Sequence, residues 1–121
     1  MVVQYTDGLD DFSIDNTTYV AELKDKNIST YTVHPRDFGL EEGNLDSIKA
    51  ENAEQSLALI NEAFSGKKGV ARDIIALNAG AAIYVSGLVN SFDEGVTQAN
   101  QILSDGSAQD KLDAYILASN S

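Results

Sequence analysis

The sequence predicts an α/β chain whose strand-rich first part precedes a helical second part, an α+β order within 121 residues. β-branched and aromatic residues dominate before residues 41–44, whereas Ala, Leu, Glu and Gln dominate after them. Hydrophobic residues make up 43% of the chain, which provides enough apolar surface for a buried core. We therefore expect one unit over residues 1–121, with strands in 1–40 and helices in 50–118.

The strand-rich part predicts a short strand followed by a β-hairpin. Residues 1–5 form an apolar run that ends in turn chemistry at residues 6–8. Residues 17–24 alternate, with Tyr19, Ala21 and Leu23 on one face, as expected of a half-buried strand. Residues 28–33 are a second β-rich run, and residues 25–27 separate the two runs as a hairpin loop would. Pro35, the single proline, ends the region.

The remaining residues predict about four helices. Apolar residues at spacings of three and four predict helices over residues 52–64 and 70–86. Ser91 and Glu94 form a capping-box pattern, which predicts a third helix to about residue 104. The fourth is expected over residues 108–118. Residues 79–82 have almost no side-chain bulk, so helix 70–86 can approach another helix closely and is expected to be central.

Charge and residue content exclude several classes of protein. The chain has 19 acidic and 8 basic residues and a net charge of −11, so neither a nucleic-acid nor a membrane partner is expected. The absence of Cys and the single His exclude thiolate and multi-His metal sites. No apolar run approaches the roughly 20 residues of a membrane span, and no signal peptide is visible, so a cytoplasmic location is expected.

Adjacent carboxylates in the loop after the first strand are the most suggestive chemistry in the sequence. Asp10 and Asp11 offer hard oxygen ligands, and magnesium is commonly held by one or two carboxylates together with substrate phosphates and water. Loops after strand ends commonly hold ligands in open α/β sheets. The pattern predicts a metal–diphosphate site, with an ordinary acidic turn as the alternative. The spacing lacks the alternating ligands and the final Glu of an EF-hand.

Other polar residues have structural interpretations. His34 is expected to be a polar strand-end residue, although a base oriented by nearby Asp37 is the functional alternative. Residues 66–69 lack P-loop spacing and predict an interhelix loop. Asn78 lies within an apolar helix and is expected to bond a buried backbone group or a neighbouring loop. Tyr84 is expected in the core or an interface. We identify no catalytic and no cofactor-binding residue.

Four stretches in order resemble the C-terminal portion of the anthranilate phosphoribosyltransferase family. They are residues 7–13 (DGLDDFS), 19–23 (YVAEL), 35–40 (PRDFGL) and 69–84, which contains GVARD and NAGAAIY. The resemblance spans nearly the whole chain, and its strength lies in the ordered set with matching spacing rather than in any one stretch.

The resemblance implies a magnesium-dependent transferase of tryptophan biosynthesis, which joins anthranilate to phosphoribosyl pyrophosphate and releases pyrophosphate. Asp10 matches the Asp of the family's metal-binding Asp-Glu pair, and Asp11 stands in place of the Glu, one methylene shorter. The family's glycine-rich phosphate loop, basic substrate loop, anthranilate-binding arginine and helical dimerisation domain lie upstream of this portion. We therefore expect a fragment that carries half a metal site and is inactive alone.

The alternative is a stand-alone acidic module that reuses the fold to bind a protein partner or to associate with itself. An unpaired sheet edge or an uncovered apolar helix face would provide the surface for either a partner or a homo-oligomer. An independent small enzyme is disfavoured because the sequence contains no self-sufficient catalytic set.

Overall fold

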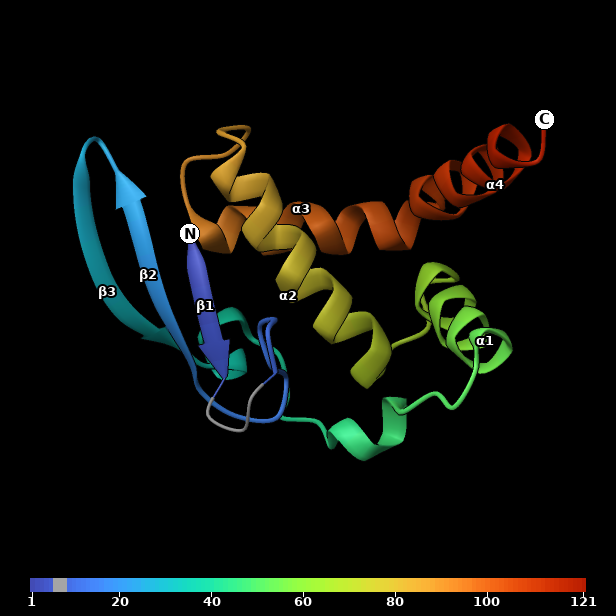
Figure 1. Cartoon of the computed structure of the whole chain (residues 1–121), viewed down its shortest axis with the longest axis horizontal. Coiled ribbons are helices and arrows are strands. Elements are labelled where there is room, and N and C mark those ends of the chain that lie inside the picture. Colours follow the sequence, from blue (N-terminus) through green and yellow to red (C-terminus); the bar gives the residue numbers. More distant parts are fainter. Residues whose placement is uncertain (6–8) are drawn as a thin grey trace.

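A computed structural model of the chain describes residues 1–5 and 9–121 (Figure 1). Within these residues, the strands β1 (Val2–Tyr5), β2 (Thr18–Lys24) and β3 (Asn27–Val33) form an antiparallel sheet in the order β1-β2-β3. The helices are α1 (Ala53–Phe64), α2 (Val70–Val85), α3 (Phe92–Asp105) and α4 (Ser107–Ser119). Figure 1 shows the sheet on one side of α2, with α1 and α4 beyond its other side. This architecture confirms the predicted fold class.

The sheet has one face against the helices and one open face, as the alternation along residues 17–24 predicts. Val20 is 3% exposed, whereas its neighbour Tyr19 is 55% exposed. The hairpin between β2 and β3 is tighter than predicted, because Asn27 already pairs with Lys24 and belongs to β3. Asp25 and Lys26 alone form the turn, with φ of 51° and 65°. Two positive φ values match a type I′ turn, whose twist suits a hairpin.

Side-chain caps begin two of the helices where the sequence predicts them. The Asn52 side-chain oxygen accepts the Gln55 N–H at 2.9 Å, and the Ser91 hydroxyl accepts the Glu94 N–H at 3.1 Å. Both bonds satisfy donors that have no partner within the first turn of a helix. Two short 3-10 helices, Pro35–Phe38 and Leu45–Ile48, were not predicted, because four residues are too few to show a periodicity.

The backbones of α2 and α3 touch at a pair of glycines. A Cβ added to Gly80 would lie 2.7 Å from both Cα and N of Val96, and one added to Gly95 would overlap the Gly80 carbonyl. The contact depends on the absence of side chains at both positions. The predicted close approach of another helix to α2 is therefore confirmed.

The core lies mainly between the sheet and the α2–α3 pair. Its buried members are Phe12, Val20, Val33, Leu77, Ala81 and Val96. Phe12 comes from the loop between β1 and β2, and its ring centroid lies 5.1 Å from that of Phe92 on α3. The loop that carries the predicted metal ligands is thus anchored in the core by the residue that follows them.

A carboxylate joins the sheet to α2. The Tyr84 hydroxyl donates to Glu22 at 2.6 Å, and the Tyr31 hydroxyl donates to the other oxygen of the same carboxylate at 2.9 Å. The bond from Tyr84, followed by the bond from Tyr31 and the charge of Lys24, lowers the pKa of Glu22 against the opposing effect of burial. Tyr84 therefore lies at the sheet–helix interface, as predicted.

Replacement of Glu22 should remove an acid-sensitive part of the stability. A lowered folded-state pKa stabilises the fold above the unfolded-state pKa, and this stability is lost as pH falls through the folded-state pKa. We expect Glu22→Gln to lower the free energy of unfolding by about 1–2 kcal/mol at neutral pH. It should also flatten the loss of stability as pH falls below the ordinary Glu pKa of 4.5. Urea denaturation across pH measures both effects, with exposed Glu51→Gln as the control. If the free energy of unfolding of Glu22→Gln fell with decreasing pH as steeply as that of the unchanged chain, this role for Glu22 would be contradicted.

Candidate functional site

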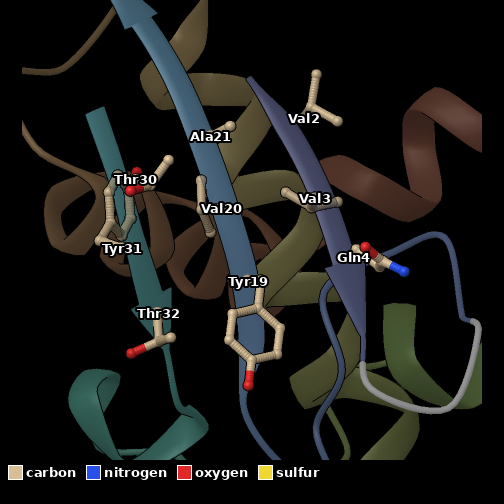
Figure 2. A pocket seen from close by; sticks show the side chains of 9 residues that line it. All are labelled: Val2, Val3, Gln4, Tyr19, Val20, Ala21, Thr30, Tyr31 and Thr32. Atoms are coloured by element: carbon tan, nitrogen blue, oxygen red, sulfur yellow. The ribbon is translucent and has the colours of Figure 1, made fainter. Parts of the chain in front are cut away.

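A shallow groove of 440 Å³ runs over the sheet, but its chemistry does not suit charged ligands. Figure 2 shows Tyr19 on β2 between Thr32 on β3 and Gln4 on β1, the row that crosses the open face. The remaining lining residues are Val2, Val3, Val20, Ala21, Thr30 and Tyr31. None of the lining residues is a carboxylate, an amine or an imidazole, so the groove offers a metal ion no charged ligand.

The predicted metal ligands lie in the loop that follows β1. Asp10 and Asp11 are both exposed, and Asp7 of the same motif lies outside the described residues. On one side of the pair, the Leu9 carbonyl accepts the Tyr5 N–H at 3.3 Å, which ties the loop to the end of β1. On the other side, Phe12 is 3% exposed and packs in the core. The two carboxylates therefore occupy a short exposed stretch between two fixed points.

Asn78 of α2 holds the backbone of this loop at Phe12. Its side-chain oxygen accepts the Phe12 N–H at 2.9 Å, and its side-chain amide donates to the Phe12 carbonyl at 2.9 Å. The same amide also donates to the Ile74 carbonyl, one turn earlier in α2, at 2.9 Å. The sequence-based interpretation of Asn78 as a residue that bonds a neighbouring loop is confirmed.

The loop remains fixed after Phe12. The Ser13 N–H donates to the Thr18 hydroxyl at 3.1 Å, and the Asp15 N–H donates to the Ser13 hydroxyl at 3.1 Å. The Ile14 carbonyl accepts the Gly43 N–H at 2.9 Å, and Ile14 itself is fully buried. Rigidity on the far side of Asp11 thus extends over several residues.

The carboxylates of Asp10 and Asp11 suit a magnesium ion that is shared with a substrate. Within the described part of the chain, neither carboxylate takes part in a hydrogen bond or an ion pair that would compete with a metal. The described residues also contain no cluster of three or more His, Asp or Glu that could hold a metal without help. Two exposed carboxylates fit the common arrangement in which water and phosphate oxygens complete the magnesium coordination.

His34 is a cap rather than a base. Its Nδ1 accepts the Arg36 N–H at 3.2 Å, and its Nε2 lies 2.8 Å from a carboxylate oxygen of Glu42. Asp37 does not orient the imidazole, since it accepts the His34 backbone N–H instead, at 2.8 Å. Both ring nitrogens are engaged at the start of the first 3-10 helix, which confirms His34 as a strand-end residue.

Arg72 links α2 to α3 and to the residues that precede α2. It donates to the Gly66 carbonyl at 3.2 Å, to the Asn100 carbonyl at 3.2 Å and to the Ser104 hydroxyl at 2.7 Å. Two of these bonds reach α3. Burial is the main cause that raises the pKa of the neighbouring Asp73 carboxyl. No pattern in the sequence indicates a contact over this separation.

Comparison with known proteins identifies the family. Residues 1–109 match the profile described as the glycosyl transferase family, a/b domain. The chain belongs to this family. Its residues 53–64 in α1 and 70–85 in α2 lie within the matched part of the glycosyl transferase a/b domain, as does the Asp10–Asp11 loop.

The similar curated members of the glycosyl transferase family are anthranilate phosphoribosyltransferases. The chain is 55% identical over 116 residues to the protein of Ruthia magnifica and 49% identical over 114 residues to that of Marinomonas sp.. These matches cover 96% and 93% of this chain but only 34% and 33% of the relatives. The resemblance inferred from the four motifs is confirmed, and the chain spans about a third of the length of these relatives.

Solved structures agree with the sequence matches. The anthranilate phosphoribosyltransferase of Thermus thermophilus superimposes with a TM-score of 0.85 at 30% identity, over 95% of this chain and 34% of that one. The Saccharomyces cerevisiae enzyme in complex with PRPP and Mg gives a TM-score of 0.77 at 26% identity, over 92% and 32% of the two chains. No helix in the described ranges is long and apolar enough to cross a membrane.

Proposed function

We propose that the chain provides the metal-binding portion of a magnesium-dependent anthranilate phosphoribosyltransferase in tryptophan biosynthesis. The complete enzyme would join anthranilate to phosphoribosyl pyrophosphate and release pyrophosphate. The observation that carries the proposal is the pair of unengaged carboxylates, Asp10 and Asp11, in a loop fixed by the bonds to Leu9 and Phe12. The relative solved with PRPP and Mg supports it.

The proposed role of Asp10 and Asp11 is to hold magnesium against the diphosphate of the substrate. When bound there, the ion supplies charge neutralisation to the departing pyrophosphate, which lowers the energy of the transition state. Asp10 and Asp11 would hold the ion on a short stretch whose backbone is bonded at both ends, at Leu9 and at Phe12. The groups that contact anthranilate would come from parts of the enzyme beyond this third of its length.

The charge of the chain is consistent with a role in metal binding while other parts of the enzyme contact the substrates. Phosphoribosyl pyrophosphate is strongly anionic, and a chain with 8 basic residues and a net charge of −11 repels it. Cations must therefore come from the ion and from other parts of the complete enzyme. We propose accordingly that the isolated chain has no transferase activity.

A chimera tests the function directly. This chain replaces the matching third of the relative that is 55% identical to it, and formation of phosphoribosyl anthranilate is measured at several magnesium concentrations. We expect magnesium-dependent activity within about tenfold of the intact relative, since the two sequences are 55% identical over the exchanged part. A folded chimera without activity would overturn the proposal, and circular dichroism with thermal melting establishes whether it is folded.

One observation favours the alternative of an association module. Large apolar side chains are exposed on the sheet, with Val2 at 72%, Leu23 at 65% and Ile28 at 76% exposure. β1 and β3 are edge strands of the described sheet, and an open edge can pair with another strand. This alternative function assigns no role to Asp10 and Asp11, so it predicts that their replacement leaves the function intact.

A further inference from the structure

We propose that Asn78 is a positioning residue for the metal loop, residues 9–12, through which α2 sets the affinity of Asp10 and Asp11 for the ion. The two bonds between the Asn78 side chain and the Phe12 backbone are called the clamp below. The inference rests on the proposed function, because it assigns the clamp a role in metal binding as well as in stability. Asn78 does not contact the metal in this proposal. It acts on the backbone of the residue that follows the carboxylate pair.

The geometry of the clamp requires an asparagine. An asparagine side chain has one acceptor oxygen and one amide group with two donor hydrogens, and here both groups are used. The oxygen and the amide contact the N–H and the carbonyl of the same residue, Phe12, each at 2.9 Å. A leucine of similar size offers no hydrogen bond, and an aspartate can accept from the N–H but cannot donate to the carbonyl.

The clamp is itself held in place. The bond from the Asn78 amide to the Ile74 carbonyl fixes the side chain against its own helix. Leu77, the neighbouring residue, is fully buried in the core, and Gly80 is in backbone contact with α3. Asn78 therefore projects from a part of α2 that cannot shift without disturbing the core.

The clamp acts at the point where the metal loop would otherwise gain freedom. Phe12 directly follows Asp11, and the opposite limit is the Leu9 carbonyl bonded to Tyr5. Only Asp10 and Asp11 lie between these two points. A binding site held in its bound arrangement avoids the entropy cost of ordering when the ligand binds. Loss of the clamp frees the Phe12 backbone next to Asp11, so the nearest backbone bond on that side becomes the one from Ser13 to Thr18, and the metal must then order a longer stretch.

The test measures metal affinity separately from stability. Mn²⁺ is titrated into the 121-residue chain, and paramagnetic broadening of the Asp10 and Asp11 amide NMR signals gives the dissociation constant. Mn²⁺ serves as the probe because it accepts the same oxygen ligands as Mg²⁺. Hydrogen exchange of the Phe12 amide reports the clamp itself, and thermal melting reports stability.

We expect Asn78→Ala to weaken Mn²⁺ binding about tenfold, within the range seen when groups that orient metal ligands are removed. Asn78→Asp retains the bond from the Phe12 N–H, so its Mn²⁺ dissociation constant should lie between those of Asn78→Ala and the unchanged chain. It also keeps the size of the side chain and provides a folded variant if Asn78→Ala is too unstable. Asn78→Ala should speed exchange of the Phe12 amide, and Asn78→Asp should speed it less because the bond from the Phe12 N–H remains.

Tyr84→Phe is the matched control. It lies on the same helix and loses one bond to the sheet, the 2.6 Å contact with Glu22, without touching the loop. It should lower the melting temperature but leave the Mn²⁺ dissociation constant unchanged. A purely structural Asn78 would likewise lower the melting temperature alone, and an unchanged dissociation constant in folded Asn78→Asp and Asn78→Ala would overturn the inference while leaving the metal site in place.

A different result is expected if Asp10 and Asp11 are not metal ligands at all. If the Asp10 and Asp11 amides of the unchanged chain are not broadened by Mn²⁺ at millimolar concentration, or if Asp10→Asn with Asp11→Asn leaves the broadening intact, the metal site is wrong. That result overturns the positioning role together with the site. Broadening that depends on the carboxylates but not on Asn78 overturns the positioning role alone.

Discussion

Gly95→Ala should destabilise the chain by about 3 kcal/mol or more, at the upper end of the cost of overpacking. The new Cβ would overlap the Gly80 carbonyl, which belongs to the backbone of α2 and cannot rotate away. The only relief is a separation of α2 from α3, which would loosen the packing of buried Leu77 and Val96. The greater helix propensity of Ala, about 1 kcal/mol over Gly, is too small to offset this cost.

Urea denaturation followed by circular dichroism measures the effect. The exposed Thr97 on the same helix provides the control, since Thr97→Ala shortens a side chain that faces solvent and should change stability by less than about 0.5 kcal/mol. Equal stability of Gly95→Ala and the unchanged chain would show that the two helices do not meet at these glycines.

Asp10→Asn, and separately Asp11→Asn, should reduce the activity of the chimeric transferase roughly 100-fold, since a bound metal contributes several kcal/mol of charge stabilisation. The replaced oxygen is similar in size, but the amide carries no charge and binds Mg²⁺ weakly. The loss should be partly recovered at high magnesium concentration, because the defect lies in metal binding. Initial rates across a magnesium titration measure both effects.

Two variants make this result specific to the metal loop. Asp11→Glu keeps the carboxylate and lengthens it by one methylene, so activity should be retained. Asp25→Asn makes the same change in charge at the hairpin tip, where Asn tolerates a φ of 51° at least as well, so both activity and stability should be unchanged. If Asp25→Asn lowered activity as much as Asp10→Asn, general charge would be the cause rather than metal binding.

Local patterns predicted most of the fold because they reflect local physics. Alternation identified β2, helical spacing identified α1 and α2, and the caps Asn52 and Ser91 marked helix starts within a residue. The hairpin loop was predicted one residue too long, because Asn27 is a common turn residue that here pairs with Lys24. The 3-10 helices were not predicted because their four residues each are too few to show a periodicity.

The arrangement around the site was less accessible from the sequence. The interpretation of the Asp10–Asp11 loop relied on a rule for parallel strands, whereas the described sheet is antiparallel. Asn78 was interpreted correctly because a polar residue in an apolar helix needs hydrogen-bond partners. The sequence near Asn78 does not indicate that Phe12 is the partner, because the two residues are 66 positions apart. The bonds from Arg72 to α3 and from Tyr84 to Glu22 also join distant residues, and only the tertiary structure shows them. Asp10 and Asp11 as ligands remain a prediction.

The bond between Phe12 and Asn78 spans 66 positions of the chain, which has a consequence for the order of folding. Contacts between distant residues form only after the intervening chain has closed, so such contacts tend to appear late. A nascent polypeptide that ends before α2 contains both carboxylates and the β-hairpin, yet lacks the amide that holds the loop. The roughly tenfold gain in metal affinity that the clamp provides would then appear only after α2 has docked, so the ion would bind the folded chain better than an incomplete one.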